Sequence, residues 1–137
     1  MSEYIIEGGT KVKGEVTISG SKNASLPIIA ASILNKGKTT LYNVPNVHDT
    51  KMMFEILKKI GGKVTKKSNK VIIDTSTIDK YDIPEELMRQ MRSSVIFAGA
   101  LIGRFKKATF SYPGGCDIGT RPIDLHLKAF EKLGINI

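Results

Sequence analysis

The chain has 137 residues, of which 41% are hydrophobic and 25% charged, and it carries a net charge of +8 and one cysteine. This composition is typical of a single globular domain, and one cysteine excludes an internal disulfide framework. The start lacks the basic and apolar regions of a signal peptide, and the longest apolar run, PIIAASIL, is too short to span a bilayer. We therefore expect a soluble cytoplasmic protein without a membrane partner.

Alternating or β-branched stretches and periodic apolar residues predict the elements in chain order. Strands are expected at 15–19, 39–44, 63–67, 70–75 and 107–112, and helices at about 23–34, 50–60, 85–102 and 121–133. Asp49 is the expected N-cap of the second helix, and Gly61 with Gly62 is its expected stop. Mixed helices and strands of this kind indicate one compact α/β unit.

The order of these elements contains an internal repeat, at residues 40–62 and 109–134. Both copies run through a strand, a proline-containing loop, an amphipathic helix and a glycine. The strands are offset by 69 positions, from Thr40 to Thr109, and the helix ends by 73, from Gly61 to Gly134. The second copy therefore holds four extra residues, around GGCD, and functional residues concentrate in such loops.

The excess positive charge sits in separate lysine clusters. These are Lys58 and Lys59, Lys63, Lys66 and Lys67, and Lys106 and Lys107. They do not form one stripe, and no helix-turn-helix, zinc or RNA-recognition motif accompanies them. A solvated surface is the simpler interpretation, and we expect no nucleic-acid partner.

The only cysteine, Cys116, lies in the glycine-rich segment PGGCDIGTR at residues 113–121. A thiol in a loop that leads into a helix meets the positive end of the helix dipole, which favours the thiolate, and Arg121 adds a fixed cation. The same arrangement suits a bound phosphate or carboxylate. A tight turn with a bystander cysteine is the alternative, and spacing alone does not decide between the two.

SGSKNA, at residues 19–24, is a second strand-to-helix loop. Lys22 and Asn23 stand at the entrance of the helix, where a lysine opposes the helix dipole unless an anion lies nearby. Arg89 and Arg92 lie three residues apart on the third predicted helix. Taken singly, these cations are read as solvated side chains. His48 and His126 offer no metal spacing.

Taken together, SGSKNASLPIIAASIL, LYNVPNVHD, MRQMRSS and PGGCDIGTRPIDLHLKAFEKLG resemble the UDP-N-acetylglucosamine enolpyruvyl transferases, the MurA family. The match runs in order from about Gly8 to Ile137 and concerns the N-terminal portion of that family only. The resemblance implies a truncated chain with part of an inside-out α/β barrel (α+β in some schemes), built of repeated βαβαββ units. Residues 1–20 would belong to the other domain of the complete fold.

The resemblance also implies roles for individual residues. Cys116 resembles the loop cysteine that protonates or captures phosphoenolpyruvate and that fosfomycin alkylates. Lys22 and Arg121 resemble the cations that hold the phosphate and carboxylate of phosphoenolpyruvate, Asn23 a contact to the amino sugar, and Arg92 a residue near the substrate phosphates. The segment that would run along the uridine comprises Arg121, Pro122, Ile123, Asp124, Leu125 and His126. No metal and no organic cofactor are implied.

The implied reaction joins the sugar 3-hydroxyl to carbon 2 of phosphoenolpyruvate and releases phosphate, in the first committed step of peptidoglycan synthesis. The family's general-base carboxylate and further arginines lie beyond residue 137, so we expect the chain alone to be inactive and prone to self-association through uncovered edges. Two alternatives are a sister transferase acting on shikimate phosphate and a non-catalytic module that binds an anion or a nucleotide sugar.

Overall fold

The computed structural model describes residues 3–114 and 122–137 of the chain, and it contains five helices and one sheet among them. The helices are α1 Lys22–Ala31, α2 His48–Lys59, α3 Glu85–Gln90, α4 Ile96–Phe105 and α5 Asp124–Lys132, with 3-10 turns η1 Ser32–Leu34 and η2 Arg92–Val95. The strands are β1 Lys38–Tyr42, β2 Lys63–Lys67 and β3 Lys70–Asp74. No helix in this described part is both long and apolar enough to cross a membrane.

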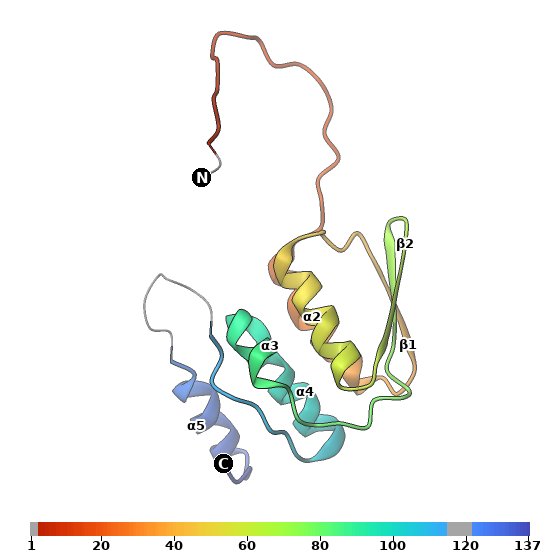
Figure 1. Cartoon of the computed structure of the whole chain (residues 1–137), viewed down its shortest axis with the longest axis vertical. Coiled ribbons are helices and arrows are strands. Elements are labelled where there is room, and N and C mark those ends of the chain that lie inside the picture. The colour runs from red at the N-terminus through yellow and green to blue at the C-terminus, as the bar shows by residue number, and fades with distance from the viewer. Residues whose placement is uncertain (1–2, 115–121) are drawn as a thin grey trace.

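The three strands form an antiparallel sheet in the order β1-β3-β2, and the helices lie on one side of it (Figure 1). Val71 and Ile73 of β3 are buried against the helices, because alternate residues of a strand point to opposite faces. Ile72, between them, points to the opposite face of the sheet. There it forms one row across the three strands with Thr40 of β1 and Thr65 of β2. The sheet therefore packs one face on the helices, chiefly on α2, and the helices pack on one another around the rest of the core.

Helix α2 is the centre of the core. Met53, Ile56 and Leu57 are fully buried, at the spacing that places side chains on one helix face. Ile29 of α1 and Phe97 of α4 are equally buried against the same core. These apolar positions follow the periodicity that predicted the helices, so the predicted α/β class and its core are confirmed.

The start of α2 differs from the prediction. Its N-cap is Val47 rather than Asp49, and Asp49 lies in the first turn. The buried Thr50 hydroxyl takes over the capping: it lies 2.7 Å from the Pro45 carbonyl oxygen and accepts the Val47 N–H at 3.4 Å. The Asp49 side chain is therefore not needed to cap α2. The predicted stop is confirmed, since α2 ends before Gly61, whose φ is +104°.

The predicted third helix, 85–102, is wrong as a single element. The chain leaves helical geometry at Met91, with φ −151° and ψ 127°, and continues as η2 and then α4. The buried Ser94 hydroxyl lies 2.6 Å from the Met91 carbonyl oxygen and 3.2 Å from that of Met88. The same two carbonyl oxygens accept the N–H groups of Ser94 and Gly114, so the break is held by a side chain and by a distant segment. Apolar periodicity in the sequence does not reveal such contacts.

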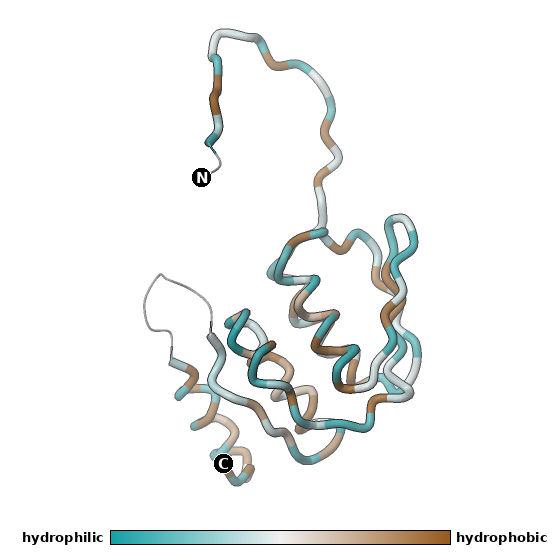
Figure 2. The backbone as a smooth tube through the Cα atoms, in the orientation of Figure 1, coloured by the Kyte–Doolittle hydropathy of each residue, from teal (hydrophilic) through white to brown (hydrophobic). Residues whose placement is uncertain are grey.

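Two predicted strands are also absent from the described residues. Residues 15–19 belong to an extended arm that leaves the body of the molecule, with Val16 83% exposed (Figures 1 and 2). Residues 107–112 make only one isolated parallel bridge, between Thr109 and Asp82. The alternating pattern is present in both, but a strand needs a neighbour to complete its hydrogen bonds.

Arg104 of α4 joins three segments through their backbones. Its guanidinium donates to the carbonyl oxygens of Ile33 at 3.0 Å, Thr75 at 2.9 Å and Ile78 at 3.0 Å. Thr75 is fully buried and its N–H donates to Gly37 at 3.0 Å. The 3-10 turn η1, the residue that follows β3 and the next loop are thus held together by one side chain.

We predict that Arg104→Met lowers the free energy of unfolding by about 2–4 kcal/mol, because carbonyls in partly buried positions lose a charged donor. Denaturant unfolding followed by circular dichroism measures the change. Lys58→Met is the matched control, since Lys58 makes only an exposed ion pair with Glu55, and such pairs contribute about 0–1 kcal/mol. Equal stability of the two variants would show that Arg104 does not hold these segments.

Asp74, at the end of β3, has a pKa below its ordinary value of 3.8. The main cause is the Ser76 hydroxyl, which donates to the carboxylate at 2.6 Å; the Ser76 N–H donates at 3.0 Å, and Lys38 and Lys63 add positive charge. A pKa that is lower in the folded state stabilises the fold above pH 3.8, and this contribution is lost as pH falls through the folded pKa.

Ser76→Ala is therefore expected to raise the pKa of Asp74 towards 3.8. The free energy of unfolding of this variant should then fall less on acidification than that of the original protein. Carboxyl NMR titration of Asp74 measures the pKa directly. Thr40→Ala, one row further along the same sheet face, is the control and leaves the titration of Asp74 in place. An unchanged titration in the Ser76 variant would refute the assignment.

Candidate functional site

The first predicted site residue, Lys22, is the first residue of α1, and its ammonium lies 2.8 Å from the carboxylate of Asp49 in the first turn of α2. The two side chains are 48% and 27% exposed. A lysine at a helix start is unfavourable unless an anion neutralises it, and the anion here comes from the chain itself. Sequence reasoning missed this role of Asp49, although the misplaced lysine was a signal that an anion was near.

The loop before α1 is packed tightly against the loop before α2. A β-carbon on Gly20 would lie 1.9 Å from the backbone oxygen of Asn43, so only glycine allows this approach. The N-cap of α1 is Ser21, whose hydroxyl accepts the Ala24 N–H at 3.3 Å. Asn23, expected beside the helix start, is an exposed residue of the first turn.

A second junction places the beginning of the glycine-rich segment beside α3. The Gly114 N–H donates to the Met88 carbonyl oxygen at 3.1 Å, and a β-carbon on Gly114 would lie 2.0 Å from the Arg89 oxygen. The predicted site residue Arg92 follows within η2 and is partly buried. The start of α2 and the end of α3 lie on the same side of the molecule in Figure 1.

The predicted uridine segment leads into α5. Ile123 is 2% exposed and its carbonyl oxygen accepts the His126 N–H at 2.8 Å. Pro122, Asp124 and His126 are exposed, and Leu125 is 80% exposed. The helix begins at Asp124 rather than near 121, and this acidic residue suits the positive end of the helix dipole. The start of α5 therefore presents the apolar Leu125 side chain and the polar His126 side chain to solvent.

Cys116 and Arg121 lie outside the described residues. Within the described part of the chain, no group of three or more histidine, cysteine, aspartate or glutamate side chains could hold a metal ion. The described site therefore consists of Lys22 with Asp49, of Arg92 beyond the Gly114 junction, and of the start of α5.

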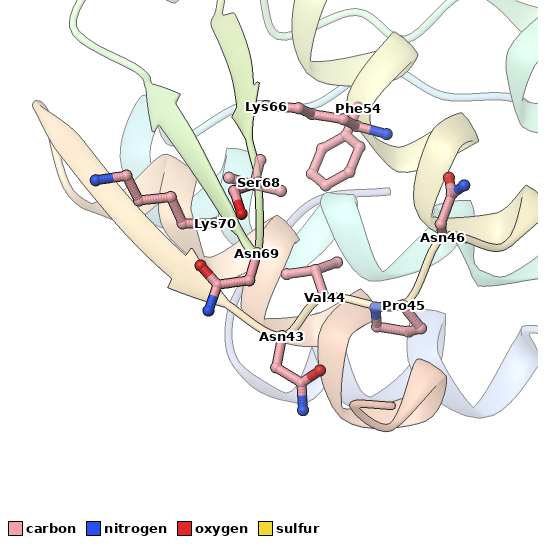
Figure 3. A pocket seen from close by; sticks show the side chains of 10 residues that line it. Asn43, Val44, Pro45, Asn46, Phe54, Lys66, Ser68, Asn69 and Lys70 are labelled. Carbon is pink, nitrogen blue, oxygen red and sulfur yellow. The ribbon is translucent and has the colours of Figure 1, made fainter. Parts of the chain in front are cut away.

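A hollow of about 330 Å³ lies beside the β1–α2 loop, but its charged groups do not converge. Its ten lining residues are Asn43, Val44, Pro45, Asn46, Phe54, Lys66, Ser68, Asn69, Lys70 and Val71. Figure 3 shows the amino groups of Lys66 and Lys70 pointing in opposite directions. We assign no ligand to this hollow.

Comparison with solved structures defines the class of fold. The enolpyruvyl transferase NikO from Streptomyces tendae superposes with a TM-score of 0.64 at 24% identity, over 72% of this chain and 23% of that one. The chain therefore has an enolpyruvyl transferase fold, as predicted.

The sequence comparisons identify the family. The profile of the EPSP synthase (3-phosphoshikimate 1-carboxyvinyltransferase) family matches residues 6–137, and the chain belongs to this family. UDP-N-acetylglucosamine 1-carboxyvinyltransferase 2 from Caldanaerobacter subterraneus is 50% identical over all 137 residues, and the enzyme UDP-N-acetylglucosamine 1-carboxyvinyltransferase from Psychrobacter arcticus is 46% identical. The chain spans about a third of the length of these relatives, 33% and 32%.

We predict that Gly114→Ala destabilises the protein by about 1–3 kcal/mol, since the added β-carbon overlaps the Arg89 backbone and forces one segment to shift. Gly99→Ala in α4 is the matched control, because a β-carbon there meets nothing within 4 Å, and alanine is favoured over glycine in a helix. Thermal unfolding of both variants tests the junction. The predicted close packing at Gly114 would be wrong if the Gly114→Ala variant were as stable as the Gly99→Ala variant.

Proposed function

We propose that this chain supplies part of the active site of a UDP-N-acetylglucosamine 1-carboxyvinyltransferase. The observation that carries the proposal is the identity of 46–50% over the entire chain to relatives with that name. The Lys22, Arg92 and Cys116 motifs lie within the matched residues. The substrates would be phosphoenolpyruvate and UDP-N-acetylglucosamine, and neither a metal nor an organic cofactor takes part.

The proposed reaction is an addition followed by an elimination. The 3-hydroxyl group of the sugar gives up its proton to a base as its oxygen bonds to carbon 2 of phosphoenolpyruvate, and carbon 3 gains a proton from an acid, so that the double bond between carbons 2 and 3 becomes a single bond. In the elimination, carbon 3 loses a proton, the double bond between carbons 2 and 3 forms again, and the bond from carbon 2 to the phosphate oxygen breaks. The products are the enolpyruvyl ether of the nucleotide sugar and inorganic phosphate.

Both substrates are anionic, so the reaction needs fixed cations around the reacting carbon. Lys22 suits this task, because its ammonium is about half exposed at a helix start and lies 2.8 Å from the Asp49 carboxylate, which orients it. We assign Lys22 and Arg121 to the phosphate and carboxylate of phosphoenolpyruvate, Arg92 to the neighbourhood of the substrate phosphates and Asn23 to the amino sugar. Held by Asp49, the Lys22 side chain loses less rotamer freedom when a substrate binds.

Cys116 is proposed as the group that delivers the proton to carbon 3 or bonds covalently to carbon 2. In the sequence, Cys116 stands in a glycine-rich segment five residues before Arg121, and a nearby cation favours the thiolate and so proton exchange near neutral pH. The same nucleophilicity would make it the site of alkylation by fosfomycin. Pro122, Ile123, Asp124, Leu125 and His126 would run along the uridine, with the exposed Leu125 side chain available to the base.

The sister reaction on shikimate phosphate is the competing function, because the family profile carries that name. Two observations favour the nucleotide sugar: the named relatives that span the whole chain, and a cysteine in PGGCDIG beside the DLH segment. The proposed activity would be a cytoplasmic step of peptidoglycan synthesis and so would serve cell-wall growth, cell shape and division.

The rate of Cys116 alkylation, followed by intact mass against pH, tests the proposal. We expect UDP-N-acetylglucosamine to change this rate and shikimate 3-phosphate to leave it unchanged, with a thiol pKa below the ordinary value of about 8.5. Arg92→Gln is expected to weaken the effect of the nucleotide sugar, and Lys128→Gln on the exposed side of α5 is the charge-matched control. A rate indifferent to the nucleotide sugar, or one altered only by shikimate 3-phosphate, would overturn the assignment.

A further inference from the structure

Strand β2 is an edge of the sheet. The order β1-β3-β2 leaves it paired with β3 alone. Its residues Lys63, Thr65, Lys66 and Lys67 are exposed. Alternate residues of an edge strand direct N–H and C=O groups away from the sheet, where another extended chain can pair with them.

The charge around this edge is strongly asymmetric. Residues 36–74, which include β1, α2, β2 and β3, contain nine lysines and three acidic residues, and so account for +6 of the net charge of +8. Each acid already has a partner: Asp49 pairs with Lys22, Glu55 with Lys58, and Asp74 with the Ser76 hydroxyl and, less strongly, with Lys38 and Lys63. The positive charge of the edge is therefore available to an external anion.

A hollow of about 290 Å³ opens between β2 and α2, beside the same edge. Its lining residues are Lys51, Phe54, Glu55, Lys58, Val64 and Lys66. The Phe54 side chain is 2% exposed, and the Lys66 ammonium lies 5.0 Å from the centre of its ring. The hollow thus combines an apolar base with lysines around it, and it faces the inner side of any strand added to β2.

We propose that the β2 edge binds an extended acidic segment of a partner protein as an additional strand. Backbone hydrogen bonds would hold the segment, and its side chains would be read alternately on the two faces, as in other strand-addition complexes. Outward acidic side chains four residues apart match Lys63 and Lys67, which are separated by about 13 Å at a rise of about 3.3 Å per residue. An inward glutamate would lay its methylene groups on Phe54 and Val64 and direct its carboxylate to Lys66.

The same charges exclude other occupants of this edge. A second copy of the chain would place Lys63 and Lys67 opposite lysines, and like charges directly across a strand pair are destabilising. A nucleic acid would satisfy the lysines but would leave the edge N–H and C=O groups without a matching backbone. An acidic peptide satisfies both, which is why we favour it.

The test uses fluorescence anisotropy of a labelled peptide of sequence Glu-Val-Thr-Glu-Glu, flanked by glycine and serine, with the 137-residue chain. Its outward positions carry glutamate, threonine and glutamate, and its inward positions valine and glutamate. We expect binding that weakens with salt. Lys63→Gln with Lys67→Gln should weaken it roughly two- to tenfold, from the loss of two cross-strand charge pairs. Lys128→Gln with Lys132→Gln, an exposed pair on α5, removes equal charge and should leave it unchanged.

Two further probes separate strand addition from plain charge attraction. A peptide of the same sequence with alternate backbone nitrogens methylated keeps every carboxylate but loses one hydrogen-bonding edge, and we expect it not to bind. Oligothymidylate of equal charge should bind more weakly than the unmodified peptide. Equal binding of the methylated peptide or of oligothymidylate, equal loss in both lysine variants, or no binding at all would each overturn the proposal. Circular dichroism of the variants confirms that they are folded.

Discussion

The Arg104 guanidinium donates hydrogen bonds to the carbonyls of Ile33, Thr75 and Ile78, which lie in η1, directly after β3 and in the loop toward α3. The helical layer and the sheet are thereby held in one relative position at the end of the molecule far from the candidate site. A planar group with five donors can serve several acceptors at once, which lysine does not do in the same geometry. Arg104 thus ties α4 to the turn that follows α1 and to the end of the sheet, while the core around α2 holds that helix in place.

At the opposite ends of these helices, an ion pair and two close backbone approaches join neighbouring segments. Lys22 and Asp49 bring the first turns of α1 and α2 together, while Gly20 and Gly114 allow the neighbouring loops to approach within the space that a side chain would occupy. A loop that is fixed by rigid helices holds its charged groups in a better defined position than a flexible loop does. Anionic substrates of the proposed transferase would meet cations whose supporting turns are already in place.

The basic edge of the sheet is a separate feature on the same framework. Lysines on an edge strand commonly protect it from pairing with another copy of the same chain. In this protein a hollow lined by Phe54 and Val64 lies beside these lysines and can take a side chain of a bound strand. The lysines that repel a second copy of the chain would attract an acidic strand. Helix α2 contributes to both features: Asp49 in its first turn pairs with Lys22, and Phe54 further along it lines the hollow beside the edge.

The sequence alone determined the fold class and the end of α2 at Gly61, because motifs and glycine stops are local properties of the chain. Lys22 and Arg92 became candidate residues through the resemblance to a family, since their local pattern is also that of solvated side chains. The break at Met91, the capping of α2 by Thr50 and the pairing of Asp49 with Lys22 were decided only in the tertiary structure. Each depends on a backbone or side-chain partner that lies outside the local pattern or on another element. Residues 15–19 and 107–112 illustrate the same limit, since both carry a strand pattern, yet a ladder exists only where a neighbouring strand supplies the other half of its hydrogen bonds.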